Sequence, residues 1–418
     1  MTSIRSIKGT QDILPDQSYR WQALEAVIRS SMECYNYKEI RTPAFERTEL
    51  FSRGVGEETD IVSKEMYSWT DQSGENLTLK PELTAPVARS FIQHNLGGQS
   101  PINKLYYIDA LFRRERPQKG RYRQFHQFGI EAFGSEHPEI DAEVIALAMS
   151  VFNNIGLGGL TLKLNSIGSS QCRSDYRNTL CDFLKPHFND LSETSQKRFE
   201  NNPLRILDTK APHEIEILKN VPNISDCWTA EDKIHFEEVC SMLDTMKILY
   251  KLTPHLVRGL DYYTRTTFEI TSTSLGAQDA LCGGGRYDRL VETLGGKPTA
   301  GIGFAAGMER ILLALGENNI SEITTQVYIV GLGDAARKTV IKLTEDLRKN
   351  NIRTNFDVLR RSIKAQMREA NKGGAQIAII IGDQELEQEK AEVKNLYSGE
   401  QDQVAINKLV NHINSLHL

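Results

Sequence analysis

The sequence predicts an α+β fold: an antiparallel β-sheet core flanked by helices, with a helical insertion and a C-terminal α/β domain. Three observations predict it. Short β-like runs follow one another as hairpins between residues 67 and 133, which favours antiparallel pairing. Between about 170 and 254 the strand runs give way to helical stretches separated by prolines. Beyond residue 325 strands alternate with helices, as in a small α/β domain.

The N-terminal elements come first. Residues 16–37 show the apolar periodicity of an amphipathic helix. Residues 37–46 alternate like a strand that Pro43 interrupts, and because proline cannot donate to a sheet ladder, we expect an edge strand or a strand that leaves the sheet there. Two β-like runs within 67–79 predict a hairpin with glycine in its loop, followed by a helix at 82–94.

The same reasoning continues along the chain. Runs at 105–113 and 124–133 predict two strands around a loop too charged to be buried. The remaining expected elements are helices at 139–155, 173–185, 192–200, 231–250, 303–315, 335–350, 362–372 and 404–416, and strands at 161–165, 266–271, 327–332, 352–357, 376–381 and 393–396.

Length and charge bound the organisation. A chain of 418 residues has room for two or three domains. The polar stretch 316–325 resembles a linker, so we expect one domain at 1–324, with its insertion at about 170–254, and a second at 325–418. Charged residues are 25% and hydrophobic residues 39%, which excludes a wholly disordered chain. With a net charge of −5, a nucleic-acid partner would have to bind a local basic patch.

The cysteines and the apolar runs indicate a compartment. The six cysteines are scattered without a CxxC pair, which argues against a structural zinc site and fits a reducing environment. No apolar run approaches the roughly 20 residues of a membrane span. The first residues lack the apolar core of a secretory signal. We therefore expect a cytoplasmic protein without a membrane partner and without a metal site of its own.

The loop FRRERPQKGRYRQF (112–125) is the strongest local signal of chemistry. Between Arg113 and Arg123 it holds six basic residues and one acid, a local charge of +5. Arginine presents a planar fork that suits phosphate oxygens, and Phe125 could stack on a base. A solvated hairpin tip is the alternative. The interleaved aromatic residues and flanking strands favour a polyphosphate or nucleic-acid site.

Other candidates are weaker on pattern alone. In HLVRGLDYYTRTTFEI (255–270), Arg258, Tyr262 and Tyr263 could line a polar pocket, or could be a buried tyrosine pair beside an ion-paired arginine, and the residues leave both readings open. CGGGRYDRL (282–290) does not have the G-x-G-x-x-G spacing of a dinucleotide site, and its glycines more simply allow close approach of a ligand or strand.

GIGFAAGMERILLAL (301–315) reads as a small-residue strand end that runs into a helix, with Arg310 off the apolar face. Pattern alone makes Arg310 an exposed helix residue. Glu82 and Glu131 lie among apolar residues, where a carboxylate is costly unless it is paired. Each could bind an amine or an imidazole, although for any single acid a structural salt bridge is favoured.

Taken together and in this order, these segments resemble the histidyl-tRNA synthetases of the class II aminoacyl-tRNA synthetases over almost the whole chain. EIRTPAFE (39–46) resembles class II motif 1, which builds the dimer interface in the family. FRRERPQKGRYRQFHQFGIE (112–131) resembles motif 2, and residues 301–315 resemble motif 3. LVRGLDYY (256–263) and CGGGRYD (282–288) resemble two segments special to the histidine enzymes, and KGTQDILP (8–15) resembles their N-terminal stretch.

The resemblance implies roles for the single residues. Arg113 and Arg258 would be catalytic, with Arg258 against the α-phosphate. The chain departs from the family at Lys80, where arginine is common, and at Asp109, where glycine is common. The implied ATP site is Arg113, Glu115, Arg121, Phe125, Arg258 and Arg310, and the implied histidine site is Glu82, Thr84, Gln127, Glu131, Tyr262 and Tyr263.

The resemblance also implies the reaction. L-histidine and ATP, with Mg²⁺ on its β- and γ-phosphates, would give histidyl-adenylate and pyrophosphate, and the tRNA for histidine would then accept the histidyl group at its 3′ end. A homodimer and an anticodon-binding C-terminal domain are implied as well. The rival is a non-catalytic, synthetase-like regulatory subunit of histidine biosynthesis, which should lack the terminal domain and have eroded ATP residues. A plain ATP-binding module would have no use for that domain.

Overall fold

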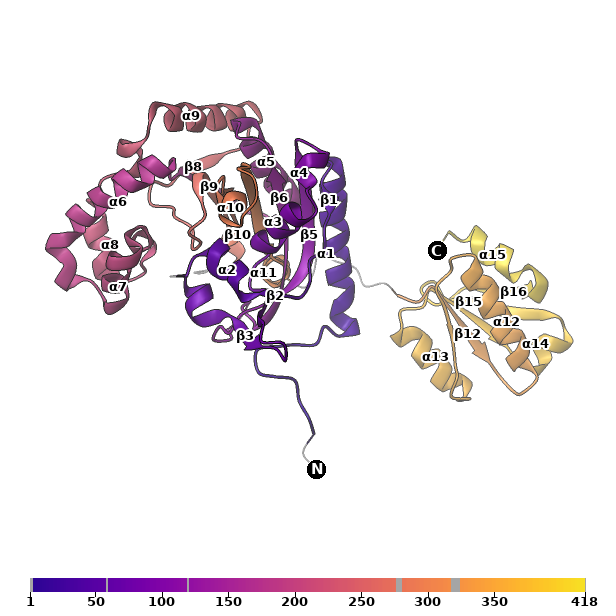
Figure 1. Ribbon diagram of the computed structural model, residues 1–418. Coiled ribbons are helices and arrows are strands. Elements are labelled where there is room, and N and C mark those ends of the chain that lie inside the picture. The colour runs from indigo at the N-terminus through magenta and orange to yellow at the C-terminus, as the bar shows by residue number, and fades with distance from the viewer. Residues whose placement is uncertain (1–2, 58, 119, 276–279, 317–323, 418) are drawn as a thin grey trace. The chain divides into compact units, whose positions relative to one another are not determined.

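A computed structural model describes residues 3–57, 59–118, 120–275, 280–316 and 324–417. The chain forms two compact units, Met1–Ile320 and Ser321–Leu418 (Figure 1). The linker expected at 316–325 falls mainly on residues 317–323, outside the described residues. Among the described residues, no helix is long and apolar enough to cross a membrane.

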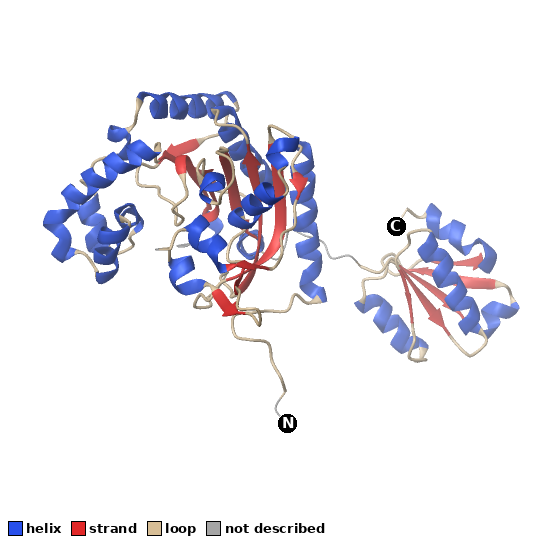
Figure 2. Cartoon of the chain, in the orientation of Figure 1, coloured by secondary structure: helices blue, strands red, loops and turns tan. Residues whose placement is uncertain are grey.

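The first unit is built on a sheet of eight strands in the order β1-β5-β6-β11-β10-β9-β7-β8 (Figure 2). The two outer pairs, β1 with β5 and β7 with β8, are parallel, and the pairs between them are antiparallel. The predicted antiparallel core is therefore confirmed. The strands are β1 (Lys38–Glu39), β5 (Asn103–Phe112), β6 (Gln124–Phe133), β7 (Leu160–Ser166), β8 (Tyr250–Leu252), β9 (Thr264–Ser272), β10 (Ala280–Arg286) and β11 (Gly301–Gly307).

Strand β6 shows how the two faces of this sheet differ. Because side chains alternate along a strand, Phe128 and Ile130 point into the main core, which α1 (Pro15–Cys34), α5 (Pro138–Ile155) and α11 (Met308–Leu315) complete. Gln127 and Glu131 belong to the opposite face. That face meets the helices α3 (Thr84–Gln93), α4 (Leu96–Gln99) and α10 (Leu290–Thr293), and α2 (Thr48–Val55) packs against α3.

The interruption predicted at Pro43 separates two sheets. Strand β1 is the edge of the large sheet, whereas β2 (Phe45–Arg47) pairs with β4 (Asn76–Leu79) in a three-stranded sheet completed by β3 (Tyr67–Thr70). The strand therefore leaves the large sheet at the proline, as expected, and the predicted 67–79 hairpin is β3–β4. A π-helix, Ile61–Glu65, precedes β3.

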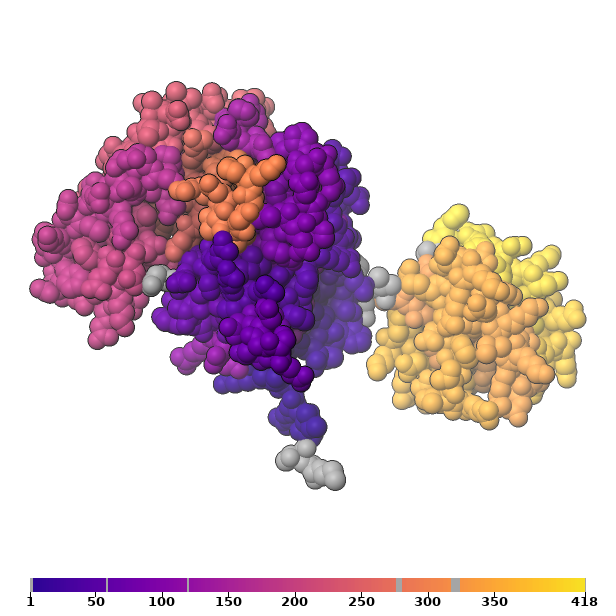
Figure 3. Space-filling view, in the orientation of Figure 1, coloured from indigo at the N-terminus to yellow at the C-terminus, as the bar shows by residue number. Residues whose placement is uncertain are grey.

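The helical insertion forms a lobe of the first unit (Figure 3). A separate buried cluster lies within it and takes in Tyr263 from the neighbouring loop. The last helix of the insertion ends earlier than expected: the helix predicted at 231–250 stops at Thr245, and β8 follows as an edge strand because Tyr250–Leu252 pairs with β7. The insertion contains α6 (Ser170–Leu184), α7 (Glu193–Asn201), α8 (Pro212–Leu218) and α9 (Ala230–Thr245), with 3₁₀ turns at Lys185–Asp190, Pro203–Asp208 and Ile224–Cys227.

A second correction concerns the glycine-rich segments. The helix predicted at 303–315 begins only at Met308, because residues 301–307 form β11 between β6 and β10. Residues 282–286 belong to strand β10, which the sequence analysis did not predict. Small residues in both strands let neighbouring backbones and side chains approach closely, and this overrides their low β-propensity.

The second unit has a five-stranded sheet in the order β13-β12-β14-β15-β16, parallel through its first three strands and antiparallel beyond them. The predicted helix at 404–416 is wrong in its first part, where residues 401–405 form a strand. The elements are β12 (Val327–Gly331), α12 (Ala336–Lys349), β13 (Thr354–Phe356), α13 (Ile363–Lys372), β14 (Ile377–Ile381), α14 (Asp383–Glu387), β15 (Lys390–Asn395), β16 (Gln401–Ala405) and α15 (Leu409–Ser415).

Candidate active site

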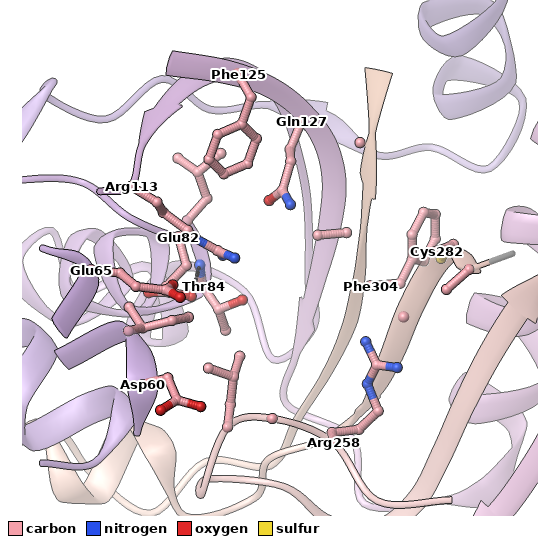
Figure 4. Close-up of a pocket in the computed structure, with 18 of the residues that line it drawn as sticks. Asp60, Glu65, Glu82, Thr84, Arg113, Phe125, Gln127, Arg258, Cys282 and Phe304 are labelled. Atoms are coloured by element: carbon pink, nitrogen blue, oxygen red, sulfur yellow. Dashed lines mark hydrogen bonds between the residues drawn. The ribbon is translucent and has the colours of Figure 1, made fainter. Parts of the chain in front are cut away.

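A pocket of about 460 Å³ opens in the first unit over the face of the sheet that carries Gln127. Figure 4 shows Arg113 beside Glu82 and Thr84 on one wall and Arg258 across the pocket. Every site residue that the sequence predicted lines this pocket except Glu131. The lining ones are Glu82, Thr84, Arg113, Glu115, Arg121, Phe125, Gln127, Arg258, Tyr262, Tyr263 and Arg310.

The β5–β6 hairpin supplies the basic wall. Arg113 follows β5, and its Nε donates to the carbonyl of Pro81 at 2.8 Å, while its guanidinium lies 5.2 Å from the ring centre of Phe125. Glu115 lies between two arginines, 3.8 Å from Arg113 and 3.6 Å from Arg121. This places cations next to an aromatic face, as a nucleoside polyphosphate requires.

The first turn of α11 is hydrogen-bonded to His126 of β6, the residue that follows Phe125. The Glu309 carboxylate accepts from the backbone N–H of His126 and lies 2.9 Å from its Nδ1. Glu309 is 8% exposed. This contact holds Arg310 at the pocket, although pattern alone had made Arg310 an exposed helix residue.

Glu82 is buried at the N-terminus of α3. Its two carboxylate oxygens accept from the backbone N–H groups of Thr84 and Ala85, each at 2.9 Å, which satisfies two of the donors that a helix start leaves unpaired. Burial nevertheless raises the pKa of Glu82 to about 7. A cationic amine entering the pocket would favour the ionised carboxylate.

Glu131 lies one layer behind the pocket surface and is 1% exposed. Its carboxylate accepts from the hydroxyls of Thr84 at 2.8 Å, Tyr107 at 3.1 Å and Tyr287. Burial raises its pKa to about 8. Gly303 makes the room for this carboxylate, since a Cβ there would lie 2.2 Å from Oε2.

The loop 256–263 brings Arg258 and Tyr263 to the pocket. Arg258 donates to Glu269 at 3.0 Å and occupies a slot above Gly283, where a Cβ would lie 1.6 Å from its Nη2. The sequence predicted only a general close approach for Gly283, Gly284 and Gly285. In the structure Arg258 is the group that approaches Gly283, whereas Phe268 approaches Gly284 and the Thr266 carbonyl approaches Gly285. Burial raises the pKa of Tyr263, so its hydroxyl stays protonated at neutral pH.

Several pocket residues were missed by sequence reasoning. Tyr107 and Tyr287 line the pocket and bond to Glu131, and Arg198, Arg205 and Asp208 reach it from the insertion. Tyr107 lies in the strand predicted at 105–113, and Tyr287 lies in the glycine-rich segment 282–290. No local pattern in the sequence connects the insertion to the pocket.

Lys80 and Asp109, the two departures from the family pattern, form an ion pair. The Lys80 side chain is 2% exposed, and its Nζ also donates to the carbonyl of Thr42 at 3.2 Å. Asp109 pairs across the sheet with Gln127, a predicted site residue.

The fold has solved relatives. The crystal structure of apo Staphylococcus aureus histidyl-tRNA synthetase matches with a TM-score of 0.84 and 40% identity, over 98% of this chain and 100% of that one. A Bacillus halodurans structure described as an ATP phosphoribosyltransferase regulatory subunit/histidyl-tRNA synthetase matches with a TM-score of 0.67 at 22% identity, which shows the fold alone. The fold is that of a class II aminoacyl-tRNA synthetase.

Sequence comparisons narrow this class. The family model for histidyl-tRNA synthetase matches residues 9–311, and the model for an anticodon binding domain matches residues 326–416. The histidine–tRNA ligases of Lysinibacillus sphaericus and Halothermothrix orenii are 48% and 47% identical, over 98% and 99% of this chain and 99% of each relative. The chain belongs to the histidyl-tRNA synthetase family. The regulatory-subunit alternative has weaker support, because the anticodon-binding unit and the predicted ATP residues are present.

Proposed function

We propose that the pocket of the first unit activates L-histidine with ATP and then transfers the histidyl group to the 3′ end of its tRNA. One observation carries the proposal: Arg113 and Arg258 stand on opposite walls of a pocket that also contains the buried carboxylate of Glu82. Cations on two sides suit a reacting phosphate, and a carboxylate beside them suits an amino group.

ATP would lie along the basic wall. Phe125 and Arg310 would enclose the adenine, because both line the pocket, Phe125 from the β5–β6 hairpin and Arg310 from α11. Arg113 and Arg121 would bind the phosphates, with Glu115 fixing the two arginines relative to each other.

The amino acid would lie deeper, against the sheet. Glu82 would hold the α-amino group, with Thr84 and Gln127 beside it. Tyr263 and Glu131 would read the two ring nitrogens of the imidazole, and Glu131 would reach the ring by releasing one of the three hydroxyl donors that cover it. Tyr262 packs against Tyr263, with 4.7 Å between the ring centres. A site with such polar partners rejects side chains that leave them unpaired.

Charge placement would drive the first step. The histidine carboxylate attacks the α-phosphorus, and the bond to pyrophosphate breaks. Arg258 would neutralise negative charge on the α-phosphate, and Arg113 would hold the leaving group. No protein nucleophile takes part.

Magnesium would enter with ATP as part of the substrate. Among the described residues, no group of three or more His, Cys, Asp or Glu side chains could hold a metal ion. Glu65 and Glu115 do line the pocket, which fits Mg²⁺ held mostly by phosphate oxygens with at most one or two carboxylates.

The second unit, taken as residues 325–418, would bind the anticodon. Residues 337–372 carry eleven Lys or Arg against four acids, a local +7, whereas residues 383–402 carry two Lys against seven acids, a local −5. A positive region on a net negative chain suits a polyanion.

We further propose a homodimer in the cytoplasm. Phe45 of motif 1 is 50% exposed, and Trp69 of β3 is 41% exposed, with their ring centres 6.0 Å apart. An apolar pair next to an unpaired sheet edge is suited to a second copy of the chain.

ATP–pyrophosphate exchange, measured with each proteinogenic amino acid in turn, tests the activity. We expect exchange with histidine alone, and none without an amino acid. Exchange that does not depend on histidine, or exchange driven by another amino acid, would contradict the proposal.

A further inference from the structure

The loop 256–263 carries Arg258 and Tyr263, and one edge of it contacts the end of α2. The backbone N–H of Asp261 donates to the carbonyl of Val55 at the end of α2, at 3.3 Å. The Asp261 carboxylate lies against Gly56, where a Cβ would come within 2.7 Å of Oδ2. These contacts fix one edge of the loop and leave the other edge to the insertion.

Two insertion side chains bond to that second edge. Arg173 of α6 donates from Nη1 to the carbonyl of Tyr263 at 2.8 Å, and both of its Nη atoms lie 3.4 Å from the carbonyl of Asp261. Asn202, at the end of α7, donates from Nδ2 to Oδ1 of Asp261 at 2.7 Å. The hydrogen bond to the carboxylate is charge-assisted and therefore among the stronger ones.

The loop also packs into the insertion. Arg205 donates to the carbonyl of Gly259. The side chain of Tyr263 is part of the insertion's buried cluster, and Val257 and Leu260 pack against that cluster. A displacement of the insertion would therefore displace the loop.

A small cavity lies between the loop and the insertion. Its volume is about 30 Å³, and Arg173, Asn202 and Arg258 are among the residues that line it. Such a space is large enough for a water molecule. The hydrogen bonds from Arg173 and Asn202 cross beside this cavity and add to the apolar packing that holds the loop.

We propose that Arg173 and Asn202 are positioning residues, through which the helical insertion sets the loop for histidine activation. The inference rests on the proposed function of Arg258 and Tyr263. The guanidinium of Arg258 lies so close to Gly283 that a Cβ there would overlap it, so a shift of the loop would move Arg258 out of this space. The same shift moves Tyr263, since both residues belong to one loop.

Asn202→Ala and Arg173→Met test this in the full-length protein, with Arg177→Met as the matched control. Arg177 lies on the same helix, and it donates to the Glu200 carbonyl at 3.4 Å, a contact that stays within the insertion. We expect kcat/KM for histidine in pyrophosphate exchange to fall roughly 10- to 100-fold, as for loss of a hydrogen bond to a charged group. The fall should combine lower kcat with higher KM for histidine, while KM for ATP changes less than about twofold and Arg177→Met stays near wild type.

A reciprocal exchange separates positioning from folding. Asn202→Asp alone places two carboxylates together and should be at least as impaired as Asn202→Ala. Adding Asp261→Asn restores an amide–carboxylate pair with the roles exchanged, and activity should recover.

The proposal is overturned if Asn202→Ala and Arg173→Met match Arg177→Met. It is also overturned if these two variants only contain fewer active sites by titration while KM for histidine is unchanged. The third contrary result is a double variant, Asn202→Asp with Asp261→Asn, that recovers no activity. Should Arg173→Met fail to fold, Asn202→Ala and the exchange decide. Absence of histidine-dependent exchange in the wild type would instead refute the proposed function.

Discussion

Glu131→Gln probes histidine recognition with the smallest change in shape. The carboxylate is enclosed by hydroxyl donors from Thr84, Tyr107 and Tyr287. An amide keeps the same size but loses the negative charge and one acceptor. A tyrosine hydroxyl can turn to accept from the new N–H, so the free enzyme should still fold.

The expected magnitude follows from that geometry. Above about pH 8, where the Glu131 carboxylate is ionised, a hydrogen bond to this charged group contributes about 1.5–3 kcal/mol, so its loss from the imidazole should raise KM for histidine about 10- to 150-fold. Arg113 and Arg310 lie on the hairpin and α11 side of the pocket, so KM for ATP should change less than about twofold.

Thermal unfolding gives an independent readout with a definite sign. Burial raises the pKa of Glu131 from 4.5 to about 8 in the folded state. A raised pKa means that the stability contribution is fully present below pH 4.5 and is lost as the pH rises toward 8. The Tm of the wild type should therefore fall relative to Glu131→Gln across this interval.

Pyrophosphate exchange with varied histidine, and then with varied ATP, provides the kinetic assay. Glu136→Gln is the matched control, because Glu136 is exposed just beyond β6. An unchanged KM for histidine, or a raised KM for ATP alone, would refute the assignment of Glu131 to the imidazole. A Tm difference that is independent of pH would refute the raised pKa.

The remaining predictions concern catalysis, assembly and tRNA. Arg258→Ala should lower kcat of exchange more than it raises KM for histidine, and near-normal exchange would remove Arg258 from the catalytic residues. Gly283→Ala should reproduce this loss, because its Cβ would occupy the position of the Arg258 guanidinium. A wild-type kcat for this variant would show that Arg258 does not need the space above Gly283. Sedimentation should show a dimer, and an active monomer would exclude one. Charge reversal at the exposed Arg360 and Lys364 should weaken tRNA charging and flatten its salt dependence, while exchange without tRNA is unchanged; unchanged charging would exclude this surface.

Much of the fold could be predicted because hydrophobic periodicity reports which face of an element is buried. The break at Pro43 was predictable because proline lacks the N–H that a sheet ladder needs. Residues 301–315 were predicted to be a strand end that runs into a helix, but the helix was started too early, at 303, because small residues carry little periodic signal. Their strand conformation depends on partners distant in sequence, such as Glu131, whose carboxylate lies against Gly303.

The site was predictable where a motif is contiguous, and less so where tertiary packing decides. Phe125 and Arg113 stand at the two ends of one hairpin, so a single segment indicates both. Arg310 looked exposed from its position on the helix, because nothing local shows that Glu309 bonds to His126. The contacts of Asn202 with the loop cross about 60 residues of sequence and leave no pattern in either segment.

The two departures from the family pattern explain each other. Taken singly, a lysine at position 80 and an aspartate at 109 each put local contacts in doubt. In the structure the buried ammonium of Lys80 meets the Asp109 carboxylate and the Thr42 carbonyl, which supplies the partners that a buried lysine requires. Thr42 immediately precedes Pro43, so this one cation connects the strand break of motif 1 to strand β5. Removing the Asp109 charge would leave the buried Lys80 ammonium with the Thr42 carbonyl as its remaining partner, whereas removing Lys80 would leave an Asp109 carboxylate that is 28% exposed and still reaches solvent.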